Sequence, residues 1–317
     1  MPRVAVIIPS YNHARFLVAA IESVLAQTCE DWTLLVLDDQ SPDDSVEVAR
    51  SFEDQRIRVL TNDRNLGTYG SQQRGVEMTE GEFVAILNSD DFWEPTKLAK
   101  QVALLDRHPE ASGCFTLGWM ADADGAILEE DVHADWPTAE VGDLLPHLLH
   151  ENRILASSVV FRRDGLAFET SCRYSGDWLA LLAACRRGPL VCVPERLTYW
   201  RQHGHNSYVR REPQLIEEIR VREAIAAWAE SAKADRAGTA RNLINLSALY
   251  VLFGDGSAAK RAAFRALRTH PRWPLAWKRW LLSLSPRLAA RRLWPGQDCG
   301  PERMYALEPL DLQRWNS

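Results

Sequence analysis

The sequence lacks several features that would identify other classes of protein. Its six cysteines are scattered and include no Cys-x-x-Cys pair, which argues against the common zinc and dithiol redox motifs. No apolar run reaches the roughly 20 residues of a membrane-spanning helix, and no secretory signal is readable at the start. The formal net charge of −6 gives no overall attraction to nucleic acid. We therefore expect a globular, cytoplasmic protein with reduced cysteines and no nucleic-acid partner.

Short apolar segments alternate with helix-period segments through the first hundred residues. The apolar segments span 4–9, 33–37, 57–60 and 83–87, and each is nearly continuous in apolar residues, as strands covered on both faces are. This alternation predicts an α/β fold with a doubly wound, Rossmann-like sheet. Asn12 is predicted to cap the helix after the first strand.

The rest of the chain is less regular and then becomes helical. Residues 158–161 and 190–193 are strand-like, and 177–185 fits a helix. From Pro213 onward the pattern is helical, with a turn at 254–256.

Acidic residues follow two of the predicted strands. The second strand ends in Asp38-Asp39-Gln40-Ser41 and the fourth in Asn88-Ser89-Asp90-Asp91. Ligands of open parallel sheets bind at the carboxyl ends of the strands, and neighbouring carboxylates there repel each other unless a cation or hydrogen-bond donors offset them. Mg²⁺ or Mn²⁺, sharing oxygens with a substrate diphosphate, fits such a cluster. Solvated helix caps are the alternative for either pair, and Asp39 could equally accept a hydrogen bond from a base or ribose.

Four segments together resemble the family 2 glycosyltransferases with the GT-A fold. They are Val6-Ile7-Ile8-Pro9-Ser10-Tyr11-Asn12, Val36-Leu37-Asp38-Asp39-Gln40-Ser41, Asn65-Leu66-Gly67 and Leu87-Asn88-Ser89-Asp90-Asp91. Gly176-Asp177-Trp178-Leu179 and Trp200-Arg201-Gln202-His203-Gly204 extend the resemblance over residues 3–210. It implies a GT-A domain at 1–210, with a nucleotide-sugar half at 1–108 and an acceptor half at 109–210. Residues 211–317 would form a helical, basic C-terminal region.

The resemblance also implies roles for individual residues. Asp177 would be the catalytic base, with Asp91 as the main metal ligand and Asp90 and His203 beside it. A nucleotide-sugar site would be formed by Pro9, Tyr11, Asn12, Asp39, Asn65, Gly67, Asp90 and Arg201.

Three departures from the family pattern affect these roles. Asn88 stands where many members carry Asp, so the metal site would depend on Asp90 and Asp91. Gly176 stands where many have Glu, and Gln72-Gln73 replace a common Arg-Asn. These departures leave a catalytically decayed nucleotide-sugar or glycan binding module as the alternative to an enzyme. A receiver-like phosphorylation domain also has acidic pairs and magnesium, but it does not explain Asp177.

The implied reaction is an inverting transfer of one hexosyl group from a nucleotide sugar. A carboxylate is far too weak to deprotonate a sugar hydroxyl beforehand, so Asp177 must take the proton as the bond forms. No second nucleophile is identified, and the Gln-x-x-Arg-Trp signature of processive members is absent. UDP is the default nucleotide, with dTDP and GDP open. A glycan or lipid-linked acceptor in cell-envelope polysaccharide biosynthesis is expected.

The stretch 260–292 contains ten basic residues and no acidic ones. Its arginines alternate with Phe264, Trp273, Trp277 and Trp280, a composition suited to peripheral contact with the inner face of an anionic membrane through residues 260–294. The alternative is a packed helical hairpin with solvated arginines, since Pro271, Pro274 and Pro286 interrupt a long amphipathic helix.

Overall fold

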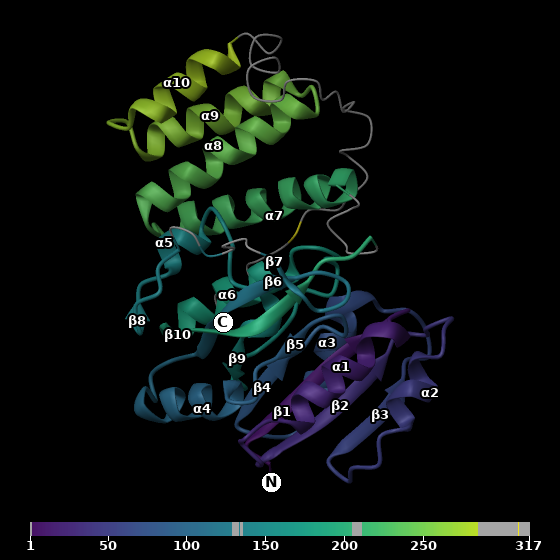
Figure 1. Cartoon of the computed structure of the whole chain (residues 1–317). Coiled ribbons are helices and arrows are strands. Elements are labelled where there is room, and N and C mark those ends of the chain that lie inside the picture. The colour runs from purple at the N-terminus through teal and green to yellow at the C-terminus, as the bar shows by residue number, and fades with distance from the viewer. Residues whose placement is uncertain (1, 129–132, 134–135, 205–210, 285–309, 311–317) are drawn as a thin grey trace. The chain divides into compact units, whose positions relative to one another are not determined.

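The computed structural model describes residues 2–128, 133, 136–204, 211–284 and 310. The chain forms two compact units, one of Met1–Leu144 with Arg153–Asn206 and one of Leu145–Asn152 with Ser207–Ser317. Figure 1 labels their elements. The first unit contains the sheet, and the second contains the C-terminal helices. The segment Leu145–Asn152 belongs with the helical unit, although it lies inside the predicted acceptor half.

The first unit is built on a mixed sheet, which has ten strands in the described residues, in the main order β3-β2-β1-β4-β9-β6-β10-β5. Strands β1 to β4 are parallel where they pair, β9 is antiparallel to β4 and β6, and β6 and β10 are parallel. The bounds are β1 Val4–Ser10, β2 Trp32–Asp38, β3 Ile57–Thr61, β4 Phe83–Ile86, β5 Phe92–Trp93, β6 Gly113–Ala121, β7 Ile127–Leu128, β8 Val141–Gly142, β9 Val160–Arg162 and β10 Leu190–Arg201.

The four N-terminal strands lie within one residue of their predicted limits. Every residue of β1 is buried, which is why its sequence is a continuous apolar run rather than an alternating one. The predicted α/β class with a doubly wound sheet is therefore confirmed.

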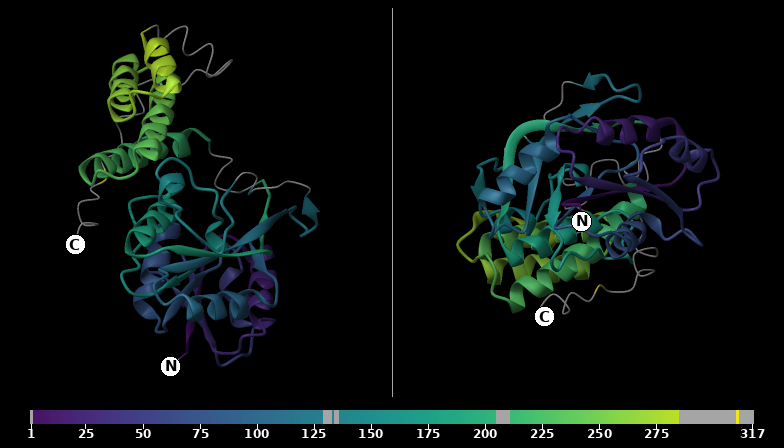
Figure 2. Two further views of the ribbon diagram at one scale, coloured as in Figure 1. Left: turned by 90° about the vertical axis from the view of Figure 1, so that its left-hand side faces the viewer. Right: turned by 90° about the horizontal axis from the view of Figure 1, so that it is seen from below.

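Helices cover both faces of this sheet, as the additional views in Figure 2 show. Helices α1 (Ala14–Leu25), α2 (Ser45–Arg50) and α4 (Lys97–Arg107) share one apolar core with the strands. Helix α3 (Gly67–Met78) packs on the opposite face, where Gly75 lies against the Ile7 side chain, and α6 (Gly176–Arg187) contacts α3.

The predicted cap of α1 was wrong. The helix begins at Ala14, and Asn12 lies before it with a left-handed φ of 57°. The first amides are satisfied from the loop after β2 and the start of α2 instead, because Ala14 N donates to Asp43 Oδ2 at 2.9 Å and His13 N to Ser45 Oγ at 3.2 Å. This long-range capping fixes the start of α1 at the carboxyl edge of the sheet.

Strand β10 is long and irregular. It pairs with β6 from Leu190 onward, but the register shifts between Val193 and Arg196 and again between Arg196 and Thr198. Pairing then resumes and ends with Arg201 opposite Ala121. Only the first four residues of this strand were predicted from the sequence.

The second unit contains α5 (Leu145–Leu148), α7 (Arg211–Ser231), α8 (Arg236–Leu252), α9 (Gly256–Thr269) and α10 (Pro274–Ser283). Asp235 and Asp255 cap α8 and α9 through their side chains, and the turn predicted at 254–256 separates these two helices. Alanines on one side of α9 are buried against α8, so the Ala-rich stretch forms a packed hairpin. In the described part of the chain, no helix combines the length and hydrophobicity needed to span a membrane.

Candidate active site

The loops after β1 and β2 are held together at the carboxyl edge of the sheet. Asp39 N donates to Ser10 O at 2.8 Å, and Asn12 N donates to Ser41 Oγ at 2.9 Å. The left-handed backbone at Asn12 turns the first loop back toward the second. Asn12, placed in the nucleotide site by the sequence, therefore lies at this edge.

The end of β1 combines buried and exposed groups. Pro9 is buried within the strand, whereas the Tyr11 side chain just beyond it is 49% exposed. Ser10 Oγ and Asp38 Oδ1 are buried and have no hydrogen-bond partner among the described residues. Buried polar atoms nearly always have partners, so this edge has capacity to bind a polar ligand.

Asp39 is a buried carboxylate that organises the loop before α3. Its side chain accepts hydrogen bonds from Asn62 Nδ2 at 2.7 Å and from Leu66 N and Gly67 N, both at 2.8 Å. Asn65 Nδ2 donates to the Asp39 carbonyl at 3.1 Å. Gly67 opens α3 with a φ of 75°, a conformation that favours glycine. The structure thus brings three predicted nucleotide-site residues together, and the three donors leave about one lone-pair site of a carboxylate.

Asp91 is more enclosed than the sequence suggests. Its carboxylate accepts hydrogen bonds from Ser157 Oγ at 2.5 Å and Arg201 N at 3.0 Å, and Asn88 Nδ2 lies 3.4 Å away. Burial, followed by the neighbouring Asp90 charge, raises the pKa of Asp91 to about 8. Asp91 therefore links three segments of the chain. Ser157, which also accepts a hydrogen bond from Asn88 N at 3.0 Å, was not identified from the sequence.

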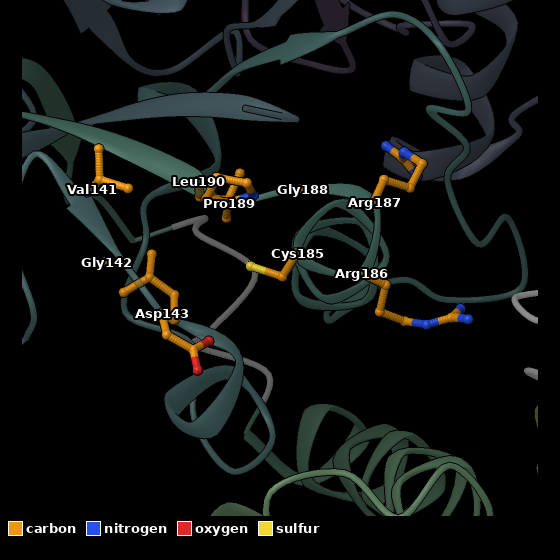
Figure 3. A pocket seen from close by; sticks show the side chains of 10 residues that line it. Val141, Gly142, Asp143, Cys185, Arg186, Arg187, Gly188, Pro189 and Leu190 are labelled. Carbon is orange, nitrogen blue, oxygen red and sulfur yellow. The ribbon is translucent and has the colours of Figure 1, made fainter. Parts of the chain in front are cut away.

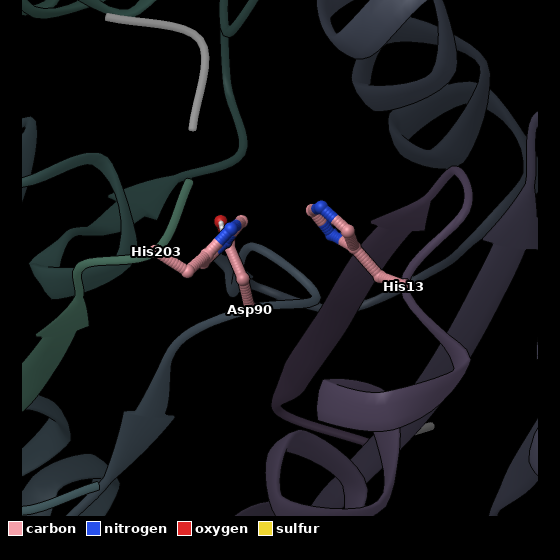
Figure 4. A group of neighbouring side chains, drawn as sticks. All are labelled: His13, Asp90 and His203. Carbon is pink, nitrogen blue, oxygen red and sulfur yellow. Dashed lines mark hydrogen bonds and ion pairs between the residues drawn. The ribbon is translucent and has the colours of Figure 1, made fainter. Parts of the chain in front are cut away.

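Asp90 lies in a cluster with two histidines, shown in Figure 4. His13, Asp90 and His203 each offer one ligand atom, and these atoms all lie within 4.8 Å of one another. His203 Nε2 is 3.1 Å from Asp90 Oδ2, and the two side chains are 4% and 15% exposed. Phe16 stacks on His203 with ring centroids 4.5 Å apart. Two imidazole nitrogens and a carboxylate form a donor set suited to a divalent metal ion. His13 was not identified from the sequence.

Arg201 supports this cluster from the end of β10. Its side chain donates to the carbonyl oxygens of Asp90 and Ala123, both at 2.8 Å. The guanidinium lies 5.2 Å from the Phe16 ring centroid and 4.9 Å from that of Phe92. Burial lowers the pKa of Arg201. The geometry gives Arg201 a positioning contact with the acidic loop, whereas its predicted contact with the nucleotide stays a prediction.

Asp177 lies in the first turn of α6 and contacts α3. Tyr69 Oη donates to Asp177 Oδ1 at 3.0 Å and is 3.1 Å from the Tyr174 carbonyl. A Cβ on Gly176 would meet Tyr69 Cγ at 2.5 Å. A side chain at position 176 would therefore collide with the Tyr69 ring in the observed arrangement. Tyr69 itself was not identified from the sequence.

A separate pocket of about 410 Å³ lies at the other end of α6, shown in Figure 3. It is lined by Val141, Gly142, Asp143, Leu144, Cys185, Arg186, Arg187, Gly188, Pro189 and Leu190. Burial raises the pKa of the Cys185 thiol to about 12, so it is protonated at neutral pH. None of the predicted site residues lines this pocket.

The chain is similar to proteins that share this fold and sequence pattern. The profile of Glycosyl transferase family 2 matches residues 5–125. The Escherichia coli UDP-Glc:alpha-D-GlcNAc-diphosphoundecaprenol beta-1,3-glucosyltransferase WfaP is 31% identical over 230 residues, which cover 71% of this chain and 87% of that protein. The enzyme WfgD of the same description and species is 40% identical over 102 residues, 32% of this chain. That match spans only 40% of WfgD.

Solved structures with low sequence identity support the fold. Staphylococcus aureus TarS in complex with UDP-GlcNAc has a TM-score of 0.65 at 16% identity, covering 92% of this chain and 91% of that chain. A mannosyltransferase from Pyrobaculum calidifontis in complex with GDP-Man and Mn²⁺ has a TM-score of 0.54 at 15% identity, covering 93% and 88%. The predicted GT-A fold is confirmed. The extended match to WfaP, together with the family profile, shows that this chain belongs to glycosyltransferase family 2.

Proposed function

We propose that the protein transfers a single hexosyl group from a nucleotide sugar to the hydroxyl of a glycan or lipid-linked acceptor, with inversion. The observation that carries this proposal is the convergence of two groups at one sheet edge. The first group is the loop held by Asp39, which follows β2. The second is the pair of Asp90, which follows β4, and His203, which follows β10. The first group suits a nucleoside and the second suits a diphosphate-bound metal ion.

The donor side is assigned to UDP-sugars by default. WfaP is named as a UDP-Glc-dependent glucosyltransferase, and TarS was solved in complex with UDP-GlcNAc. The nucleoside would contact the exposed Tyr11 side chain and Asn12 on one side and the loop from Asn65 to Gly67 on the other. The buried oxygens of Ser10 and Asp38 that have no partner among the described residues support a polar ligand there.

The residues present fit a divalent metal ion, Mn²⁺ or Mg²⁺. Asp90 replaces Asp91 as the main ligand in this proposal, because the Asp91 oxygens already face Ser157 and the Arg201 amide. Asp90 and His203 would hold the ion, and Asp91 would keep the acidic loop in place. A bound divalent cation would stabilise the negative charge of the leaving diphosphate.

Asp177 is proposed as the base that accepts the acceptor proton while the new bond forms. Tyr69 donates to one carboxylate oxygen, which fixes the direction of the other. One base and one displacement predict inversion at the anomeric carbon. A decayed binding module is the competing function, and it predicts donor binding without transfer.

The Asp177→Asn variant tests this assignment. We expect sugar transfer from UDP-glucose to an α-GlcNAc-diphosphate lipid to fall at least 100-fold, while UDP binding measured by calorimetry stays within about threefold. Asp164→Asn changes an exposed carboxylate of the same unit and should leave both measurements unchanged. Retained transfer by Asp177→Asn would reject Asp177 as the base. A product with retained anomeric configuration would reject direct displacement.

We also propose that the helical unit contacts an anionic membrane surface. Five of the nine large hydrophobic residues that are exposed in the described chain lie in or just after α9 and α10, namely Phe264, Leu275, Trp277, Leu281 and Leu284. Exposed basic residues accompany them at Arg261, Arg268, Arg272 and Lys278. Apolar side chains among basic ones suit a bilayer with anionic headgroups. Residues 285–294 of the predicted contact lie outside the described residues.

A lipid-linked acceptor and a cytoplasmic location at the inner membrane face are part of this proposal. WfaP and WfgD are both named as glucosyltransferases that act on alpha-D-GlcNAc-diphosphoundecaprenol. Sedimentation with vesicles containing anionic lipid should capture the protein, and vesicles of neutral lipid should not. Trp277→Ser with Leu281→Ser should weaken capture at least tenfold, whereas Val18→Ser, at an exposed apolar position of α1, should not. Equal capture of all forms would reject the α10 surface.

A further inference from the structure

The cluster of His13, Asp90 and His203 contains one more histidine than the proposed reaction uses. Three distant segments supply it: the residue before α1, the loop after β4 and the end of β10. Figure 4 shows the His13 ring across from the Asp90 and His203 side chains. Because the three ligand atoms lie within 4.8 Å of one another, one ion could contact all three with small side-chain adjustments.

We propose that His13 is a third protein ligand of the metal ion, so that the site selects Mn²⁺ and later transition-metal ions over Mg²⁺. This inference rests on the proposed metal site at Asp90 and His203. A site with a single carboxylate and phosphate oxygens would accept Mg²⁺, which prefers oxygen ligands. Two imidazole nitrogens change that preference, because imidazole binds first-row transition metals much better than Mg²⁺.

Ser89 provides a second observation in favour of this role. His13 Nδ1 lies 2.8 Å from Ser89 Oγ, in the residue next to Asp90. If Nδ1 carries the proton and donates to Ser89, the lone pair of the neutral ring lies on Nε2, the atom that a metal would take. Metal-binding histidines usually have such a partner on the other nitrogen. Ser89 thereby receives a role within the acidic motif that the sequence left unassigned.

The aromatic surroundings restrict the two imidazoles. The His13 and His203 rings are nearly perpendicular with centroids 5.5 Å apart, and both contact Phe16. Phe16 is itself buried in α1. Rings held in this way lose little freedom when a ligand arrives, which favours binding in the observed geometry.

The direct test is pulsed electron paramagnetic resonance of Mn²⁺ bound to the full-length protein with UDP. The spectrum of the wild type should show two directly coordinated nitrogens, and that of His13→Gln should show one. The Mn²⁺ affinity of the variant should fall at least tenfold, and its preference for Mn²⁺ over Mg²⁺ should shrink. Ser89→Ala should reduce Mn²⁺ affinity about 10- to 100-fold if Ser89 orients the ring.

The control is His108→Gln, a substitution on α4's C-terminal side where the ring pairs with Glu110 and Glu140. It should bind Mn²⁺ as the wild type does. A single coordinated nitrogen in the wild type would overturn the proposal without requiring any variant to fold. Unchanged Mn²⁺ affinity in His13→Gln would also overturn it. Two nitrogens together with no transfer from any nucleotide sugar would support this site and reject the proposed reaction instead.

Discussion

Replacing Gly176 with alanine should separate activity from stability. The added Cβ would lie 2.5 Å from Tyr69 Cγ and 2.6 Å from Cδ2. Carbon atoms normally approach to about 3.5–4.0 Å, so the ring must move by about 1 Å. That movement would displace the Tyr69 hydroxyl from Asp177 Oδ1, with which it forms a 3.0 Å hydrogen bond.

The substitution has two opposing effects on the free energy of unfolding, whereas its effect on catalysis has one direction. Overpacking costs about 1–3 kcal/mol, whereas alanine gains at most about 1 kcal/mol over glycine in a helix interior and less at the first helical position, which Gly176 occupies. The net loss of unfolding free energy should therefore be modest, about 0–2 kcal/mol. A displacement of about 1 Å at a catalytic group can lower the rate by about 100-fold. We expect kcat to fall between 10- and 100-fold with little change in the KM for the donor.

Steady-state transfer assays and urea unfolding on the same preparations would measure both effects. Gly142→Ala is the matched control, because no atom of the described part of the chain lies within 4 Å of the Cβ it would carry. Tyr69→Phe keeps the ring and removes the hydroxyl, so it should reproduce the loss of kcat without the overpacking. Wild-type kcat in Gly176→Ala would refute the reasoning that Tyr69 positions Asp177.

Two further predictions concern buried polar groups behind the site. Lys97 is completely buried, and burial lowers its pKa to about 7. In the unfolded chain the same amine keeps its proton up to about pH 10.4. The free energy of unfolding should therefore rise by about 1–2 kcal/mol between pH 7 and pH 8.5. Urea unfolding should show that this rise disappears in Lys97→Met, and an equal rise in the variant would contradict the assignment. Ser157→Ala removes a donor to Asp91 and an acceptor for the Asn88 amide, so the free energy of unfolding should fall by about 2–3 kcal/mol. Ser51→Ala, at an exposed hydroxyl, should cost much less, and similar losses in both would argue against a specific role for Ser157.

The sequence predicts the N-terminal half of the sheet well because burial on both faces leaves a simple pattern. Strands β1 and β2 are continuous apolar runs, and their limits follow from where the apolar residues end. In β10, Pro194, Glu195 and Arg196 interrupt that pattern. Only the four residues before this interruption were predicted, although pairing with β6 continues beyond it.

The sequence identifies candidate site residues that lie in short motifs, such as Asp39, Asp90 and Asp177. It does not identify the residues that contact them. Tyr69 and Asp177 are 108 positions apart, Ser157 and Asp91 are 66 apart, and His13 and Ser89 are 76 apart. No local periodicity encodes contacts at such separations. The predicted cap of α1 was wrong for the same reason, because Asp43 in the loop after β2 and Ser45 at the start of α2 accept hydrogen bonds from the first amides.

The irregular stretch of β10 determines which lengths of this strand a homologue can tolerate. Side chains alternate between faces along a strand, and each unpaired residue reverses that alternation. With both register shifts in place, the Arg201 amide faces Asp91 and the Arg201 side chain is buried. Deleting one residue between Val193 and Thr198 would bring Gln202 to that position and carry His203 away from Asp90. Homologues that keep the histidine should therefore vary in length after it or before Leu190, and not between Val193 and Thr198.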